Sequence, residues 1–227
     1  MKSTPRRRLL SILALCLILG VTGSVSAQAD VAPVHSGTDA ATLARIHTPP
    51  SHNSAEPVTS GSAVLEQQRH VLAKQDGVAP SAVRCWDGIS IWSYGNGRFV
   101  STEVGYGGGY NGMLRARATV VDAWERYGVC RDSSTGLTYF WSDENGRLVS
   151  AELGYGGIDY GMLRARATVG DTWEQYYTSA EPGEGYTYFY AYGNGRYVSA
   201  ELGYDGDRYG MLRARATAVS SWEWFSW

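Results

Sequence analysis

One segment occurs three times in this 227-residue chain at a constant interval. The third copy, residues 194–222, is NGRYVSAELGYDGDRYGMLRARATAVSSW, and the other copies begin at Asn96 and Asn145, so that successive copies are 49 residues apart. A period of this length marks one repeated supersecondary unit. Three nearly identical units without atypical end caps favour a closed, three-fold assembly over an open solenoid.

Each repeat predicts β-strands. In residues 196–202, Val198, Ala200 and Leu202 alternate with other side chains, and residues 211–217 alternate apolar residues with arginine. This period of two is typical of half-buried strands. A glycine-rich turn joins the two strands, and further strands are expected at 186–192 and 222–225. Four strands in three copies predict an all-β fold, a twelve-stranded β-trefoil with pseudo-threefold symmetry.

The repeat also carries a resemblance to a known family. Its order is Asn-Gly-Arg-aromatic-Val-Ser-Ala-Glu, then a hairpin that ends in Leu-x-Ala, then Trp-Glu. This order resembles the repeat of fascin-like β-trefoil domains, and the resemblance covers roughly residues 86–227. It implies a β-trefoil fold, with binding or bundling of actin filaments as the implied activity.

The first 27 residues predict a signal peptide. Lys2 and the arginines at 6–8 form a basic segment, an apolar run follows at 9–21, and small residues surround Ala27. This order predicts export, so that the expected localisation is secreted or extracellular. The adjacent arginines leave a twin-arginine signal open. The apolar run is short for a membrane span, and no membrane insertion is expected.

Residues 28–80 predict a low-complexity linker, and the β-trefoil is assigned to residues 81–227. All 28 aromatic residues follow Cys85, so the linker has little apolar surface to bury and is expected to be largely disordered. Residues 62–74 could form a short amphipathic helix. We interpret this helix as part of a spacer; a docking or pro-segment is the alternative.

The cysteines predict one disulfide. Cys16 lies in the signal peptide, so Cys85 and Cys130 remain in the mature chain. An even pair in an exported protein is typical of a disulfide. Reactive thiols or metal ligands are the alternative, but the domain has no histidine to support a metal site.

The residues of the repeats do not favour catalysis. All histidines precede the trefoil, at His35, His47, His52 and His70, so no Ser-His or Cys-His pair can form inside it. Its glutamates recur with threefold symmetry, whereas a pair of catalytic carboxylates needs two unlike environments. We therefore expect no enzyme activity, no cofactor and no metal site.

Charge and symmetry also bear on the partner. From residue 82 onward the chain has thirteen Arg and no Lys against seventeen Asp and Glu, which argues against nucleic acid as a ligand. We interpret the repeated arginines mainly as cross-strand partners of the repeated glutamates. We interpret the recurring Trp124, Trp173 and Trp222 as packing residues rather than platforms for sugars.

The glycine-rich hairpin loops are the candidate contact sites. Loops on a rigid scaffold often carry function, and tyrosine offers an apolar ring face together with a hydroxyl group. We predict binding of a polysaccharide or cell-surface glycan by a monomer, with actin as the alternative partner. The alternative is that the first tyrosine of each loop packs inward. The candidate ligand-binding residues are Tyr106, Tyr110, Tyr155, Asp159, Tyr160, Tyr204, Asp205, Asp207 and Tyr209.

Overall fold

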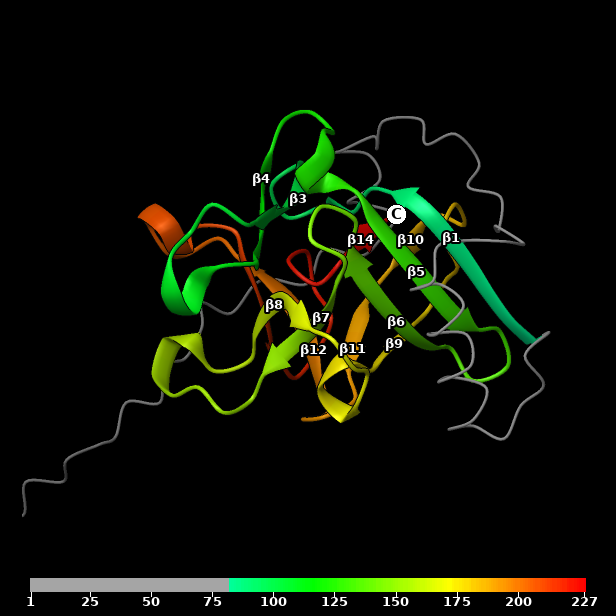
Figure 1. Cartoon of the computed structure of the whole chain (residues 1–227). Helices are drawn as coiled ribbons and strands as arrows, with labels where there is room; N and C mark the ends of the chain where they lie inside the picture. Colours follow the sequence, from blue (N-terminus) through cyan, green and yellow to red (C-terminus); the bar gives the residue numbers. More distant parts are fainter. Residues whose placement is uncertain (1–81) are drawn as a thin grey trace, which may run out of the picture. The chain divides into compact units, whose positions relative to one another are not determined.

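The structure is a computed structural model that describes residues 82–227 (Figure 1). The predicted signal peptide and linker, residues 1–27 and 28–80, lie outside the described residues, as does the candidate helix at 62–74. Within the described part, the regular elements are β-strands and short 3-10 turns. The predicted all-β class is confirmed.

Fourteen strand segments form one continuous sheet. The first repeat holds β1 (Val83–Ile89), β2 (Trp92–Ser93), β3 (Arg98–Glu103), β4 (Met113–Ala118) and β5 (Tyr127–Asp132). The second holds β6 (Leu137–Ser142), β7 (Arg147–Glu152), β8 (Met162–Ala167) and β9 (Tyr176–Thr178). The third holds β10 (Tyr186–Thr187), β11 (Phe189–Ala191), β12 (Arg196–Glu201), β13 (Met211–Ala216) and β14 (Phe225–Ser226). Because β1 and β2 are parts of one interrupted strand, as are β10 and β11, the segments correspond to the predicted twelve strands.

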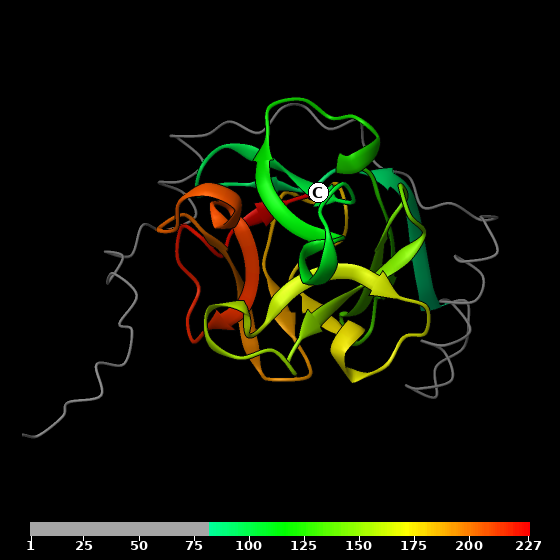
Figure 2. The ribbon, with the colours of Figure 1, turned by 60° about the vertical axis from the view of Figure 1, so that its left-hand side comes forward.

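The strand pairing is that of a β-trefoil. A closed ring of antiparallel pairs runs from β1 through β5, β6, β9 and the β10–β11 strand to β14, which pairs with β2. Each repeat adds a hairpin, formed by β3 with β4, β7 with β8, and β12 with β13. The strands β4, β8 and β13 pair with one another, so the three hairpins surround a common axis (Figure 2).

The core is built from equivalent positions of the three repeats. Apolar side chains of the hairpins enter it at the alternate positions that the sequence predicts, and aromatic side chains of the barrel strands fill its centre. Burial of these side chains supplies the main stabilising term. The hairpin positions are Val100, Val149 and Val198, Leu114, Leu163 and Leu212, and Ala116, Ala165 and Ala214; the barrel positions include Ile91, Phe140, Phe189, Tyr127, Tyr176 and Phe225.

The expectation that these hairpin strands are only half-buried is wrong. On β12 the polar Ser199 and Glu201 are 2% and 1% exposed, and Arg213 on β13 is 6% exposed. The opposite face of each hairpin is therefore covered as well. The alternation of residue types correctly predicts which side chains enter the apolar core, but the other face is covered by ion pairs and by the neighbouring loop.

The predicted cross-strand ion pairs are present in all three hairpins. Arg215 on β13 contacts both carboxylate oxygens of Glu201 on β12, with a Nη2 to Oε2 distance of 2.8 Å. Arg117 with Glu103 and Arg166 with Glu152 repeat this arrangement. Each glutamate side chain is 1% exposed, whereas the arginines reach solvent. Each glutamate is thus buried against the guanidinium group of the neighbouring strand, and Glu152 also lies 3.9 Å from Nη1 of Arg164.

Replacing Arg215 with alanine is expected to lower the free energy of unfolding by about 2 kcal/mol, because Glu201 then stays buried without its counter-ion. The loss is below the full range for buried pairs because the Arg215 side chain is 26% exposed. Urea denaturation at neutral pH measures it. The double variant Arg215→Met with Glu201→Gln is expected to recover most of the stability, since no buried charge remains. Equal unfolding midpoints for the single and double variants would contradict the assignment.

The predicted strand at 222–225 is wrong in its first half. In the first two repeats the equivalent residues form 3-10 turns, Ala123–Glu125 and Thr172–Glu174, each closed by a capping box. In the third repeat Glu223 likewise accepts from the backbone N–H of Ser220 (2.8 Å). The strand β14 begins only at Phe225. In each turn the glutamate side chain accepts a hydrogen bond from the backbone N–H of the residue three positions before it. This local bond competes with strand pairing for the same segment.

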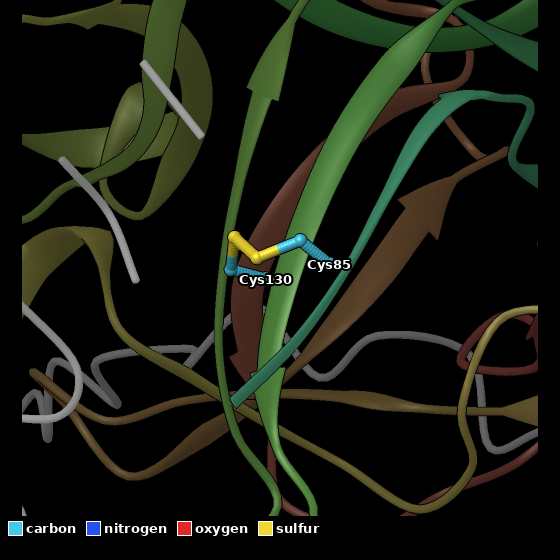
Figure 3. The surroundings of a disulfide bond; sticks show 2 residues. All are labelled: Cys85 and Cys130. Carbon is cyan, nitrogen blue, oxygen red and sulfur yellow. A yellow bond between two sulfur atoms is a disulfide. The ribbon is translucent and has the colours of Figure 1, made fainter. Parts of the chain in front are cut away.

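The predicted disulfide between Cys85 and Cys130 is present (Figure 3). The two cysteines face each other on β1 and β5 in the antiparallel register. Both side chains are fully buried in a second apolar cluster that includes Leu137 and Trp141 on β6. The disulfide therefore fastens the first strand of the described part to the barrel.

Candidate functional site

The three hairpin loops meet around the threefold axis. We call residues 104–112, 153–161 and 202–210 loop 1, loop 2 and loop 3. Directly after the loops, Met113, Met162 and Met211 begin β4, β8 and β13, and they form a fully buried cluster. Because β4, β8 and β13 pair with one another at this point, the loops form one composite surface instead of three separate sites.

Each loop is braced by an arginine of a hairpin strand. Arg164 on β8 donates from Nη1 to the Tyr155 hydroxyl (2.6 Å) and from Nε and Nη2 to the carbonyl oxygen of Asn111 in loop 1 (3.0 and 2.8 Å). The equivalent Arg115 and Arg213 contact the tyrosine of their own loop and a carbonyl of the neighbouring loop. These charge-assisted bonds run around the axis and hold the loops rigidly.

At the axis, three equivalent positions carry three different residues. Tyr110 donates from its hydroxyl to Asp159 Oδ2 (3.1 Å), and Arg208 donates from Nε to Asp159 Oδ1 (3.2 Å). The Arg208 guanidinium also donates to the Tyr110 hydroxyl and lies 5.4 Å from the centroid of its ring. We call these residues the axial trio. At these equivalent positions the three loops differ in sequence, and the three side chains bond to one another across the axis.

Two loop tyrosines have raised pKa values. Burial raises the pKa of Tyr106, with Glu103 adding to the effect and Arg115 opposing it. Burial also raises the pKa of Tyr110, with its hydrogen bond to Asp159 adding to the effect. Both hydroxyls therefore remain protonated at neutral pH and act as hydrogen-bond donors or acceptors, not as anions.

The structure separates the candidate binding residues into three groups. Tyr106, Tyr155 and Tyr204 are partly buried, and each hydroxyl is bonded to an arginine. Inward packing of the first tyrosine is therefore what the structure shows for each loop. Tyr110 and Asp159 belong to the axial trio. The exposed group consists of Tyr160, Tyr209, Asp205 and Asp207, of which Asp207 accepts a 3.4 Å bond from the Tyr106 hydroxyl.

Several residues of the loop surface were not singled out from the sequence. Arg208 completes the axial trio, and Asn111 occupies in loop 1 the position of Tyr160 and Tyr209. Asn111 donates from Nδ2 to the carbonyl oxygens of Val104 and Tyr106 within its own loop. Aligning the three repeats column by column would have found these positions, because they differ where most of the repeat is constant.

The repeated tryptophans, interpreted from the sequence as packing residues, are only partly buried and lie outside the apolar core. Trp173 is 37% exposed, and Trp124 and Trp222 are intermediate. They lie in or beside the turns that precede β5, β9 and β14 and contact loop glycines; a Cβ atom added to Gly154 would lie 3.4 Å from the Trp173 ring. They pack at the periphery of the loop surface.

No cluster of three or more metal-ligating side chains occurs within 82–227. No helix in this part of the chain is long and apolar enough to cross a membrane.

No protein-family model matches the chain, and no curated protein matches it. Similar solved structures include ThreeFoil, a designed 3-fold symmetric protein, at 12% identity and a TM-score of 0.49, covering 60% of this chain and 94% of that chain. The exo-β-1,3-galactanase 1,3Gal43A from Clostridium thermocellum is 13% identical with a TM-score of 0.49, over 62% of this chain and 29% of its own. A mosquitocidal holotoxin is 13% identical with a TM-score of 0.48, over 60% of this chain and 16% of its own. The assignment of the β-trefoil fold rests on the strand pairing of residues 82–227 themselves.

Proposed function

We propose that residues 82–227 form a non-catalytic module that binds a polysaccharide or cell-surface glycan through the loop surface. The observation that carries this proposal is the pair of exposed tyrosine rings on braced loops, Tyr160 and Tyr209, which are 38% and 39% exposed. An exposed aromatic ring whose backbone is fixed can stack on the apolar face of a sugar with little loss of conformational entropy.

The bracing bonds involve the backbone at these positions. The carbonyl oxygen of Tyr160 accepts from Arg213 Nε, and that of Tyr209 accepts from Arg115 Nε, each at 3.0 Å. The bracing arginines therefore bond the backbone of these tyrosines and not their rings. On loop 3 the carboxylates of Asp205 and Asp207 are also exposed, and they can accept hydrogen bonds from sugar hydroxyls.

The loop surface favours an extended glycan over a single small sugar. The two exposed rings lie on different loops, and each offers a sugar one exposed ring face rather than an enclosed pocket. Shallow contacts that engage one polymer together gain affinity through effective concentration. Export of the chain, as its N-terminal sequence predicts, would bring such a module to extracellular polysaccharides.

The proposal is tested by retention of the full chain on insoluble cellulose, chitin, xylan, β-1,3-glucan and cell-wall preparations. The double variant Tyr160→Asn with Tyr209→Asn copies the residue that loop 1 carries naturally at this position, and it keeps both backbone carbonyls. We expect it to fold normally and to lose at least about ten-fold in retention. The matched control is Val120→Asn, which removes a side chain that is 68% exposed outside the loops.

Sedimentation with filamentous actin in parallel tests the activity that the resemblance to fascin-like domains implies. Co-sedimentation with actin and no retention on any glycan would overturn the proposal. If the double variant is retained as well as the wild-type protein, the chain binds a glycan but not through the tyrosines of the loop surface, and the proposed site is wrong.

A further inference from the structure

A hollow lies beside the loop surface, at the connection between β8 and β9. It is lined by Asp171, Thr172, Trp173 and Glu174, the residues of the second 3-10 turn and its cap. The Trp173 side chain is 37% exposed, whereas the large apolar side chains of the core are buried. The hollow therefore combines an exposed indole ring with a carboxylate and a hydroxyl group, and none of these residues belongs to the three loops.

The polar groups of this hollow are held in place by the turn. Asp171 Oδ1 accepts from the backbone N–H of Thr172 (2.7 Å) and from its hydroxyl (3.0 Å). Beneath them Glu174 is 6% exposed; it accepts from the Ser150 hydroxyl (2.6 Å) and from the backbone N–H of Asp171 (2.9 Å). Burial raises the pKa of Glu174. The wall of the hollow is therefore rigid, with Asp171 and Thr172 at its exposed edge.

Two glycines keep the Trp173 ring open. A Cβ atom at Gly154 would lie 3.4 Å from Cη2 of the ring, and one at Gly193 would lie 3.3 Å from Cδ1. The Cβ atom of any other residue at either position would contact the edge of the indole ring. The chain instead places glycine at both edges.

The equivalent positions of the other repeats differ from this arrangement. In the first repeat, Ala123 occupies the position of Thr172, and in the second repeat Glu144 occupies the position of Gly193. At the third repeat, Ser220 replaces Asp171. Trp124 and Trp222 are also less exposed than Trp173. The full combination of carboxylate, threonine hydroxyl, exposed indole and flanking glycines occurs at Trp173.

We infer that the hollow at Trp173 is a second binding site, which holds one pyranose ring of a glycan. The apolar face of the sugar stacks on the indole, while Asp171 and Thr172 bond its hydroxyls. This combination of one aromatic surface with a few fixed polar groups is typical of small-molecule sites. The inference takes its ligand class from the proposed function but assigns a different place on the molecule.

The test is an NMR titration of the full chain, labelled at the tryptophan indole nitrogens, with cellohexaose, xylohexaose, laminarihexaose and chitohexaose. We expect one of these probes to shift the Trp173 indole signal, assigned from the Trp173→Phe variant. Thr172→Ala and Asp171→Ser copy residues from the other repeats and therefore preserve the turn. Each is expected to weaken binding by about three-fold or more, and Trp173→Ala by about ten-fold. The matched control Trp124→Ala is expected to leave binding within two-fold.

The outcomes separate this inference from the proposed function. If Tyr160→Asn with Tyr209→Asn abolishes binding and Trp173→Ala leaves it unchanged, the second site is overturned and the loop surface stands. If Trp173→Ala weakens binding and the loop variant does not, the hollow is the glycan site and the loop assignment falls. If no probe shifts the Trp173 signal, the inference is overturned.

Discussion

Replacing Gly161 with alanine is expected to destabilise the domain by about 4 kcal/mol or to prevent folding, because the residue has a positive φ and no space for a side chain. Its φ is +75°, and a Cβ atom would lie 2.6 Å from the carbonyl oxygen of Ala214. The clash is with backbone of the neighbouring repeat, so no rotation of a side chain can relieve it. Thermal and urea denaturation measure the loss.

The same position carries the contact between repeats. The carbonyl oxygen of Gly161 accepts from the backbone N–H of Ala214 at 2.8 Å, and the N–H of Gly161 donates to the backbone carbonyl oxygen of Glu152 at 3.0 Å. Gly112 and Gly210 make the equivalent contacts in the other repeats. A side chain at any of these glycines would therefore push neighbouring hairpins apart at the axis, directly below the loop surface.

Gly157 in the same loop provides the matched control. Its φ is +60°, and a Cβ atom there would meet nothing within 4 Å. Gly157→Ala therefore keeps the conformational cost and omits the clash, and we expect a loss of only about 1 kcal/mol. Equal losses for the two variants would show that close packing between repeats contributes little.

Removing the disulfide is the second large effect. Cys85 and Cys130 are 45 residues apart, and closing a loop of this length stabilises by about 4 kcal/mol on the loop-entropy model. We expect the double variant Cys85→Ala with Cys130→Ala to lose a comparable amount, measured by urea denaturation against the oxidised protein. Reduced wild-type protein should unfold at nearly the same midpoint as the variant.

The loss should be local as well as global. Among the strands of residues 82–227, β1 pairs with β5 alone, whereas β2 makes the contacts to β14 and β3. Hydrogen exchange of the variant should therefore increase first in β1, while the hairpins around the axis keep their protection. A stability change below about 1 kcal/mol, or uniform exchange throughout the domain, would contradict this role of the disulfide.

The local pattern of the sequence was enough to predict the fold. The constant interval indicated three equal units, and the alternation around Val198 and Leu212 correctly identified the side chains that enter the core. The pairing of Arg215 with Glu201 followed from the same alternation, because residues on one face of neighbouring strands meet. These predictions depend on contacts within one repeat.

The same pattern misjudged the segment around Trp222. Its apolar residues favoured a strand. Glu223 instead accepts a hydrogen bond from the backbone N–H of Ser220, three residues before it, and this local turn takes the place of strand pairing until Phe225. The tryptophans consequently lie beside the loops instead of in the core. The hollow at Trp173 could not be foreseen for the same reason.

The sequence by itself determined the repeated unit, its strands, its core face and the cysteine pair, because each depends on the order of residues within one repeat or on a simple count. Only the tertiary structure decided that the loops share one surface and that Tyr110, Asp159 and Arg208 meet at the axis. It also decided that Tyr155 turns inward toward Arg164 while Tyr160 stays exposed. The shared surface and the axial trio depend on closure of the threefold arrangement, which brings side chains from different repeats within bonding distance, and the inward turn of Tyr155 depends on how its loop folds back onto β8.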